Sequence, residues 1–184
     1  MALTGTPAQA AEVVAFWRAA GPQRWFRKDE AFDADFRQRF LALHEQAATG
    51  ALNGWAGDAE GALALLILLD QFPRNAFRGS ARTYATDRQA LAIARTAIAR
   101  GLDTQVAAEL QGFFVLPLMH SEDPADQALS VEKSAPLGGD THRFALHHQD
   151  IIRRFGRFPH RNAILGRAST PAEEQFIAEG GFAG

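Results

Sequence analysis

A chain of 184 residues fits one domain better than two, because domains most often hold on the order of 100–150 residues. The hydrophobic content of 47% is that of an ordinary globular protein, and the absence of cysteine excludes disulfides, thiolate catalysis and cysteine-based metal sites. A formal charge of −2 gives no overall attraction to nucleic acid or anionic membranes, although every basic residue except Lys28 and Lys133 is arginine.

Helix signals begin near the start of the chain. Thr6 followed by Pro7 predicts an N-cap and a first helical position, and Gly21 predicts the end of that helix. Phenylalanine and leucine recur at intervals of four, four and three between residues 32 and 43, which predicts a second helix with one apolar face. Gly50 is expected to close it.

The most apolar segment predicts the central helix of the fold. Asp58 is its expected N-cap, the helix is expected over about residues 59–71, and Pro73 is the expected stop. A buried strand is the rival interpretation, but the capping aspartate and the leucine and alanine content favour a helix. The run is apolar all round, so we expect three of its leucines to be fully buried, namely Leu65, Leu66 and Leu69.

The second half of the chain also predicts helices and no strand. Thr170-Pro171-Ala172-Glu173 has the pattern of a capping box with proline at the first helical position, and it predicts a short last helix. With no alternating strand pattern, the sequence predicts an all-α single domain over residues 1–184. The other helices are expected from Thr86 or Asp87 to Gly101, from Asp103 or Thr104 to just before Pro117, from a cap at Ser121 or Asp123 to Gly138, and from about Asp140 to Gly156.

Three segments resemble the signature blocks of a known family. Residues 65–75 read LLILLDQFPRN, residues 116–123 read LPLMHSED, and residues 154–162 read RFGRFPHRN. With their flanking residues they resemble the bacterial family called domain of unknown function 924, over about residues 17–177. The flanking pattern consists of Trp25-Phe26, Phe32-Asp33, Leu165-Gly166-Arg167 and Ser169-Thr170-Pro171. The resemblance implies a tetratricopeptide-like array of antiparallel helix pairs, and it implies no particular activity.

Polar residues of the three segments are the candidates for a functional site, because side chains at several helix ends can converge on one ligand. We therefore expect the three segments to lie next to one another. The acid–base candidates are His120, Glu122, Asp123 and His160. The candidate ligand-binding residues are Asp70, Gln71, Arg74, Asn75, His148, Arg154, Arg157, Arg161 and Asn162.

An anionic group is the expected ligand, because arginine forms short bidentate contacts with carboxylates and phosphates. We predict that Arg74, Arg157 and Arg161 hold this group together, beside the acid–base candidates. The alternative is that these arginines pair with acids of the protein itself, for example Glu122 or Asp123. In that case the cluster stabilises the fold and binds nothing.

Other chemistries fit the sequence less well. Segments 120–123 and 148–150 offer imidazole and carboxylate, but their spacing matches no metal motif and the nearby arginines would oppose a cation. Ser121 lies beside His120 but lacks the Gly-x-Ser-x-Gly pattern of a nucleophile elbow. The sequence therefore predicts neither a metal nor a cofactor.

Three classes of function stay open. The first is an enzyme or binder of a small anionic ligand, and the second is a tetratricopeptide-like module that binds a peptide. The third and least favoured is nucleic-acid contact through the arginine-rich residues 143–167, which the acidic remainder opposes. No signal-peptide pattern is present, and the longest apolar run, 62–69, is far shorter than the roughly 20 residues of a membrane span. We therefore expect a cytoplasmic protein without membrane contact.

Overall fold

The computed structural model describes residues 7–182, which form helices and turns and no strand, so the all-α prediction is confirmed. Thr6, the predicted first N-cap, lies outside the described residues. Among residues 7–182, no helix combines the length and the apolar character that crossing a bilayer requires. The α-helices are α1 (Ala8–Ala20), α2 (Pro22–Trp25), α3 (Glu30–Ala48), α4 (Ala59–Leu66), α5 (Phe72–Ala76), α6 (Asp87–Ala99), α7 (Gly112–Met119), α8 (Pro124–Ser134), α9 (Gly139–Phe155) and α10 (Pro171–Ala178).

Shorter helical segments connect these helices. One of them is a π-helix, η2 (Ile67–Gln71), which joins α4 directly to α5. The others are 3-10 turns: η1 (Asn53–Gly57), η3 (Ala81–Tyr84), η4 (Asp103–Gln105), η5 (Ala108–Leu110) and η6 (Pro159–Arg161).

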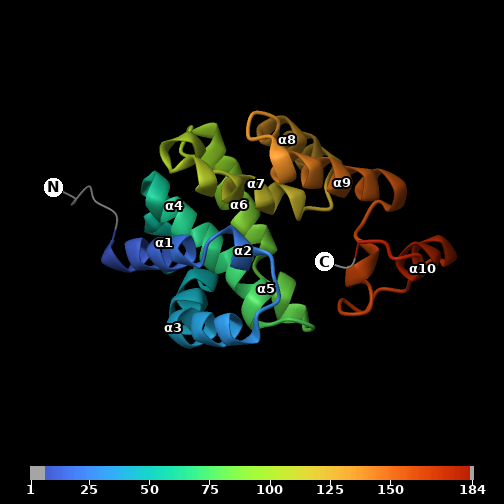
Figure 1. Ribbon diagram of the computed structural model, residues 1–184, viewed down its shortest axis with the longest axis horizontal. Helices are drawn as coiled ribbons and strands as arrows, with labels where there is room; N and C mark the ends of the chain where they lie inside the picture. Colours follow the sequence, from blue (N-terminus) through green and yellow to red (C-terminus); the bar gives the residue numbers. More distant parts are fainter. Residues whose placement is uncertain (1–6, 183–184) are drawn as a thin grey trace.

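Helix α4 is the axis of the larger part of the molecule, with α1, α6 and α7 packed against it (Figure 1). All eight of its residues except the first two are buried, as its continuous apolar run predicts. The main core contains the phenylalanines of α3, the tryptophans of α1 and α2, and the leucines of α4 and η2. From α6 onward the chain packs stepwise, α6 on α7, α7 on α8 and α8 on α9.

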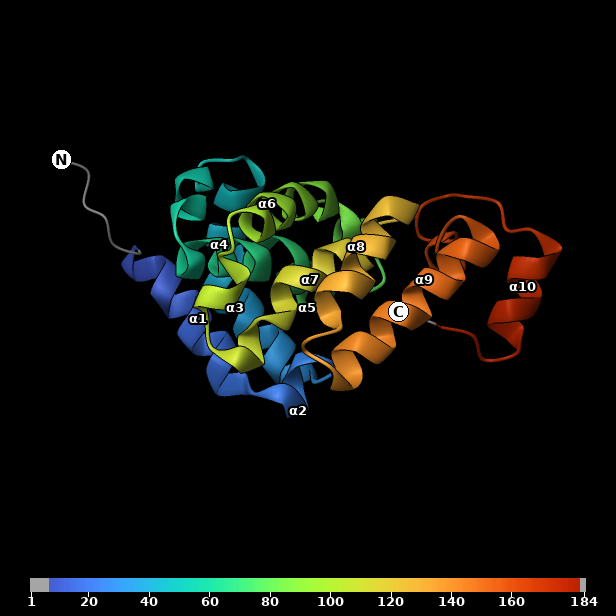
Figure 2. The ribbon, with the colours of Figure 1, turned by 90° about the horizontal axis from the view of Figure 1, so that it is seen from above.

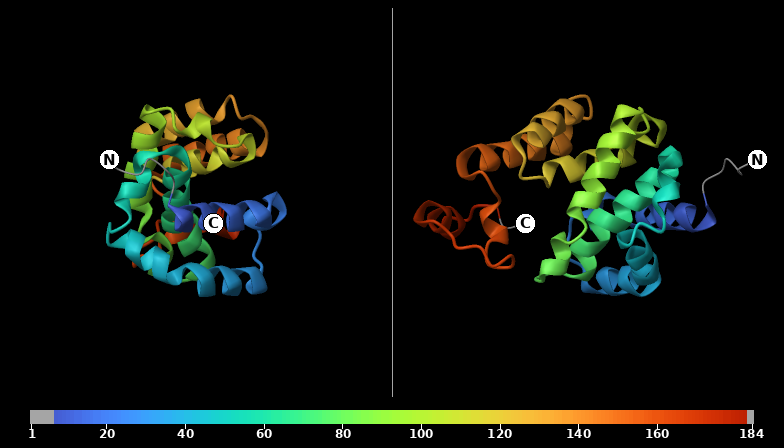
Figure 3. Two further views of the ribbon diagram at one scale, coloured as in Figure 1. Left: turned by 90° about the vertical axis from the view of Figure 1, so that its left-hand side faces the viewer. Right: turned by 180° about the vertical axis from the view of Figure 1, so that it is seen from behind.

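The α9–α10 end of the molecule has its own small core. Ile151, Ile152 and Phe158 are buried there, and Phe155, Phe176 and Phe182 pack against them. Figure 2 shows α9 and α10 extending away from α1, and the right-hand view of Figure 3 places them at opposite ends of the molecule. This small core is therefore packed separately from the main core.

The predicted helix stop at Pro73 is wrong, because the rod that starts as α4 continues through η2 into α5. In η2 the N–H of Phe72 donates to the carbonyl of Ile67, five residues earlier, so the chain makes one wide turn. Pro73 then stands as the second residue of α5, a position at which its missing N–H is tolerated.

The carbonyls that the wide turn and the proline leave unpaired are satisfied by side chains from elsewhere. His44 Nδ1 donates to the Leu68 carbonyl at 2.9 Å. Thr86 Oγ1 donates to the Leu69 carbonyl at 2.5 Å, in place of the N–H that Pro73 lacks. Because both donors come from distant segments, local sequence rules could not anticipate that the helix continues.

The single helix predicted between Asp103 and Pro117 is also wrong. Val106 and Ala107 are extended, which divides this stretch into η4, η5 and the start of α7. Pro117 lies inside α7 instead of after it. Burial of the surrounding side chains, among them Phe114 and Leu118, outweighs the lost backbone hydrogen bond.

Two predicted helix ends that position the candidate site are confirmed. α9 ends at Gly156, which adopts the left-handed conformation with φ of 70°. The capping box at the start of α10 is present, since Thr170 accepts from the N–H of Glu173 and the Glu173 carboxylate accepts from the N–H of Thr170. Segment 157–169 is thereby held between two defined helix ends.

Replacing Leu66 by alanine is expected to lower the free energy of unfolding by about 3 kcal/mol, because a large cavity opens in a packed core. Leu66 is 1% exposed, and Leu65 and Leu69 are fully buried as predicted. Urea unfolding measures the change. The control is Leu146→Ala on α9, where the leucine is 46% exposed and the loss should stay near 0.5 kcal/mol. Equal losses in the two variants would contradict the packing described.

Candidate functional site

Asp70 is a carboxylate buried at the centre of the candidate site, on the wide turn of η2. The residue is 1% exposed, and its carboxylate has three polar neighbours. His120 Nδ1 lies 2.7 Å and Arg74 Nη1 3.2 Å from Oδ1, and Gln71 Nε2 donates to Oδ2 at 2.6 Å. Burial alone would raise the pKa of the Asp70 carboxyl, but the charge of Arg74 and the contact with His120 lower it overall. Asp70 is therefore an ionised hydrogen-bond acceptor.

His120 is held by Asp70 in one defined tautomer. It caps the C-terminus of α7, and because a carboxylate only accepts, its Nδ1 must carry the proton. Nε2 has no partner within residues 7–182, and the side chain keeps 14% of its surface exposed. Burial lowers the pKa of His120, and the charge of Arg74 lowers it further, which outweighs the opposing effect of Asp70. The imidazole is therefore neutral near pH 7, with Nε2 as a base.

A second carboxylate, Asp87, lies between two arginines. Arg74 donates to both of its oxygens, at 2.8 and 3.1 Å, and also to the Asp70 backbone carbonyl at 2.8 Å. Arg161 comes only to 3.7 Å from Asp87, which is too far for a hydrogen bond. Asp87 is therefore paired mainly with Arg74 and only weakly with Arg161.

Arg161 is the least satisfied charged group of the cluster. Its residue is 7% exposed, yet its guanidinium donates no hydrogen bond within residues 7–182, and Nε is fully buried without a partner. The rings of Tyr84 and Phe158 lie 4.7 and 4.5 Å from its Cζ atom. Burial lowers the pKa of Arg161, and the charge of Arg74 lowers it further. The Nε–H is therefore a buried donor without an acceptor, which is uncommon because buried polar groups are normally hydrogen-bonded.

Two more imidazoles line the same region. His148 of α9 donates from Nδ1 to the Phe144 carbonyl at 2.8 Å, and its ring lies 6.2 Å from that of His120. Burial and the neighbouring His120 lower the pKa of His148 to about 3. Burial and the charge of Arg161 lower the pKa of His160 to about 4, and its Nδ1 is buried without a partner. Both imidazoles are neutral near pH 7, so they act as polar surfaces and carry no charge.

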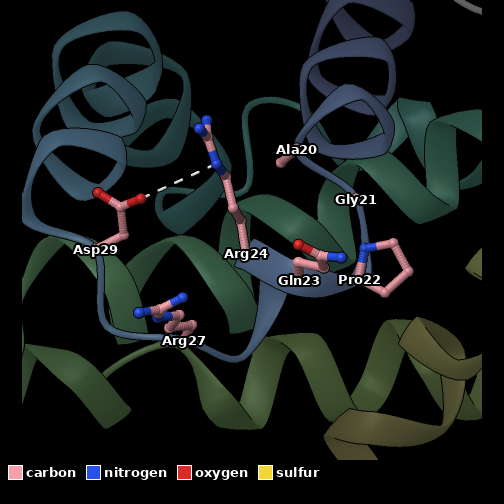
Figure 4. A pocket seen from close by; sticks show the side chains of 7 residues that line it. All are labelled: Ala20, Gly21, Pro22, Gln23, Arg24, Arg27 and Asp29. Carbon is pink, nitrogen blue, oxygen red and sulfur yellow. Dashed lines mark ion pairs between the residues drawn. The ribbon is translucent and has the colours of Figure 1, made fainter.

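A separate cavity of about 490 Å³ lies between the end of α1 and the start of α3 (Figure 4). Arg24, Arg27 and Asp29 line it, and Arg24 Nε lies 4.0 Å from Asp29 Oδ2. None of its lining residues belongs to the buried cluster. Arg24 is 59% exposed, so its charge is screened by solvent and gives little selectivity.

The comparisons with known proteins decide the family. A family model described as "Bacterial protein of unknown function (DUF924)" matches residues 13–181. The chain belongs to the DUF924 family. It is similar to a solved structure from Agrobacterium tumefaciens described as protein of unknown function ATU0120, with 51% identity and a TM-score of 0.93. That match covers 95% of this chain and 99% of the other. The comparison with curated proteins found no match.

The three signature segments of this DUF924 chain do meet in space, as expected. Asp70 contacts His120, and Arg161 of the third segment approaches Asp87 beside Arg74. Seven of the thirteen candidate residues belong to this one cluster, whose members are Asp70, Gln71, Arg74, His120, His148, His160 and Arg161. We refer to these seven residues together with Asp87 as the Asp–His–Arg cluster.

Arg157 does not join the anion site that we predicted for it with Arg74 and Arg161. It forms a bidentate pair with Glu173 of α10, at 2.6 and 2.8 Å. The left-handed turn at Gly156 directs the chain so that Arg157 lies against α10, whereas Arg161 lies against Asp87. For Arg157 the alternative holds, in which arginine pairs with an acid of the protein.

Five further candidates also have structural partners outside the cluster. Glu122 accepts from Arg167 at 2.7 and 3.0 Å and from the N–H of Phe158 at 2.8 Å, which fixes the chain before η6. Asp123 caps α8 by accepting from the N–H of Ala125. The other three contacts are Asn75 with Asp33, Arg154 with Asp150 at 3.7 Å, and Asn162 with Ser169 and Glu173. Within residues 7–182, no three histidine, aspartate or glutamate side chains are grouped so that they could hold a metal ion.

Two residues of the site were absent from the sequence-based candidates. Asp87 gave the signal of an ordinary helix start, and its role depends on a contact across 13 residues. Tyr84 is the only tyrosine of the DUF924 chain, which was the one available hint that it is special.

Proposed function

We propose that this protein binds a small molecule with an oxyanion group, carboxylate or phosphate, and that the Asp70–His120 pair performs acid–base chemistry on it. The observation that carries the proposal is Arg161, a guanidinium that is almost completely buried and donates no hydrogen bond within residues 7–182. An oxyanion is the ligand that such a group binds best, through two parallel N–H···O bonds.

Electrostatics also support an anion at Arg161. Arg74 and Arg161 both lie close to the single carboxylate of Asp87, and their two positive charges repel each other. A bound oxyanion removes this repulsion and gives the Nε–H of Arg161 an acceptor. Because the site is buried, these contacts are stronger than on an exposed surface.

The Asp70–His120 pair supplies the arrangement that a general base needs. Asp70 fixes the Nδ1–H tautomer, so the lone pair of Nε2 is available to take a proton from a bound ligand or a water. A positioned base of this kind typically contributes on the order of 10²–10⁴ in rate. The lowered pKa keeps His120 in its basic form near neutral pH.

Phosphate and acetate should stabilise the protein in proportion to the logarithm of their concentration, by about 2.7 kcal/mol at 100 times the dissociation constant. Melting temperatures at constant ionic strength measure this. In Arg161→Gln the shift should disappear. The matched control is Arg143→Gln, because Arg143 is 70% exposed on α9 and should leave the response unchanged.

A calorimetric titration of the same anions tests the acid–base pair separately. A new negative charge beside the neutral imidazole of His120 raises its pKa, so binding in mild acid should take up protons, and His120→Gln should reduce the uptake. The proposal would be contradicted if neither anion changed the melting temperature, or if the melting temperature rose equally in Arg161→Gln. It would favour the peptide-binding module, which stays a prediction from the family resemblance, as do its tetratricopeptide-like helix pairs.

A further inference from the structure

The aromatic ring of Phe182 occupies a cage of three imidazoles. Its centroid lies 5.6 Å from His147, 4.7 Å from His148 and 5.1 Å from His160. The interplanar angles are 75°, 65° and 82°, so all three contacts are of the edge type that aromatic rings prefer. This surface is shaped for a flat ring more than for a flexible aliphatic chain.

A glycine turn places Phe182 there. Gly180 has a φ of 81°, a conformation that side chains oppose. At Gly181 a Cβ atom would come within 2.5 Å of the Phe176 carbonyl and 2.7 Å of its ring. Both positions require glycine, and together they return the chain from α10 to the imidazole cage.

Phe182 is held there weakly. No backbone hydrogen bond joins it to residues 7–181, and its side chain is only partly buried. The Phe182 ring therefore makes well-oriented aromatic contacts, while its backbone is not fixed by hydrogen bonds to residues 7–181. A ligand with a comparable ring could replace it at low cost.

The cage and the anion site share a wall. The centroid of the Phe158 ring lies 5.5 Å from that of His148 and 5.8 Å from that of His160. The same ring centroid lies 4.5 Å from Cζ of Arg161. His148 and His160 themselves contact Phe182 and are close enough to Arg161 for its charge to lower their pKa values, so a ring in the cage lies near that cation.

We infer that the ligand of the proposed site carries an aromatic group next to its oxyanion, and that this group takes the place of the Phe182 ring between His147, His148 and His160. This inference rests on the proposed function, because Arg161 holds the oxyanion. Phe182 then acts as an internal cover that the ligand displaces.

The test compares acetate, hexanoate and 3-phenylpropanoate in binding to the wild-type chain, Phe182→Ala and Arg161→Gln. Removal of the competing ring should tighten 3-phenylpropanoate about tenfold in Phe182→Ala, while the affinity for acetate stays constant. Hexanoate should gain much less, because an aliphatic chain makes no edge contacts with imidazoles. Phe144→Ala is the matched control, since Phe144 is 44% exposed on α9 outside the cage.

The outcomes separate the two claims. If acetate binds through Arg161 but 3-phenylpropanoate is not tightened in Phe182→Ala, or hexanoate gains as much, the aromatic inference is overturned and the anion site stands. If no carboxylate binds the wild-type chain or Phe182→Ala more tightly than it binds Arg161→Gln, the proposed function itself fails. Loss of helical content in Phe182→Ala would show that the ring is a structural part of the fold, and would also overturn the inference.

Discussion

Replacing Asp70 by alanine is expected to lower the free energy of unfolding by about 4 kcal/mol, because it removes one partner from a buried ion pair. Asp70 is 1% exposed and accepts from His120, Gln71 and Arg74. Without it, Arg74 and Arg161 would share Asp87 alone in a region that excludes water. Urea unfolding followed by circular dichroism measures the loss.

The chain contains a matched control for this variant. Asp35 also pairs with an arginine four residues later, Arg39, at 2.7 Å, but its side chain is 46% exposed. Asp35→Ala should therefore cost less than about 1 kcal/mol, the usual range for exposed pairs. If both variants lost the same stability, burial would not explain the importance of Asp70.

Mild acid is expected to destabilise the protein by about 4 kcal/mol between pH 7 and pH 5. Below their ordinary pKa of 6.5, His148 and His160 take up protons when unfolded, while the folded pKa values of about 3 and about 4 keep them neutral in the structure. The unfolded state then binds more protons, so stability falls as pH falls, by roughly 1.36 kcal/mol per pH unit for each group. Denaturant titrations at several pH values measure the slope.

The groups facing these imidazoles explain why they resist protonation. His148 meets His120, His147 and Arg161, and His160 meets Arg161, His120 and Arg74, with Glu122 as its one acidic neighbour. The double variant of His148→Gln and His160→Gln should show a much smaller slope between pH 7 and pH 5. His147→Gln, at an exposed position, should keep the wild-type slope. An unchanged slope in the double variant would assign the acid sensitivity to other groups.

Local signals predicted the parts of the fold that depend on local interactions. The apolar run of α4, the glycine stop of α9 and the capping box of α10 each involve residues within one or two turns of the same helix. The predicted stop at Pro73 failed because a threonine from a distant segment provides the missing hydrogen bond. A one-dimensional rule about proline contains no information about such a partner.

The same distinction applies to the candidate site. Polar residues at predicted helix ends correctly indicated Asp70, His120 and Arg161 as neighbours. What the sequence could not reveal is which arginine pairs with which acid, because a pairing depends on the angle at which the chain leaves each helix. Arg157 and Arg161 are four residues apart, yet one lies against Glu173 and the other near Asp87.

The wide turn of η2 has a consequence for the periodicity of the whole α4–α5 rod. Each residue of an α-helix advances about 100° around the axis, so one additional residue shifts the phase of everything after it by about that angle. Residues 59–66 present their apolar surface to the main core, whereas Asp70, within the wide turn, and Arg74, after it, turn toward His120 and Asp87. Deleting one residue within 67–71 would restore a regular helix and rotate the charged residues away from their partners, with the apolar half undisturbed. The rotation at η2 therefore determines that the first part of this helix packs in the core and the second part contributes residues to the site.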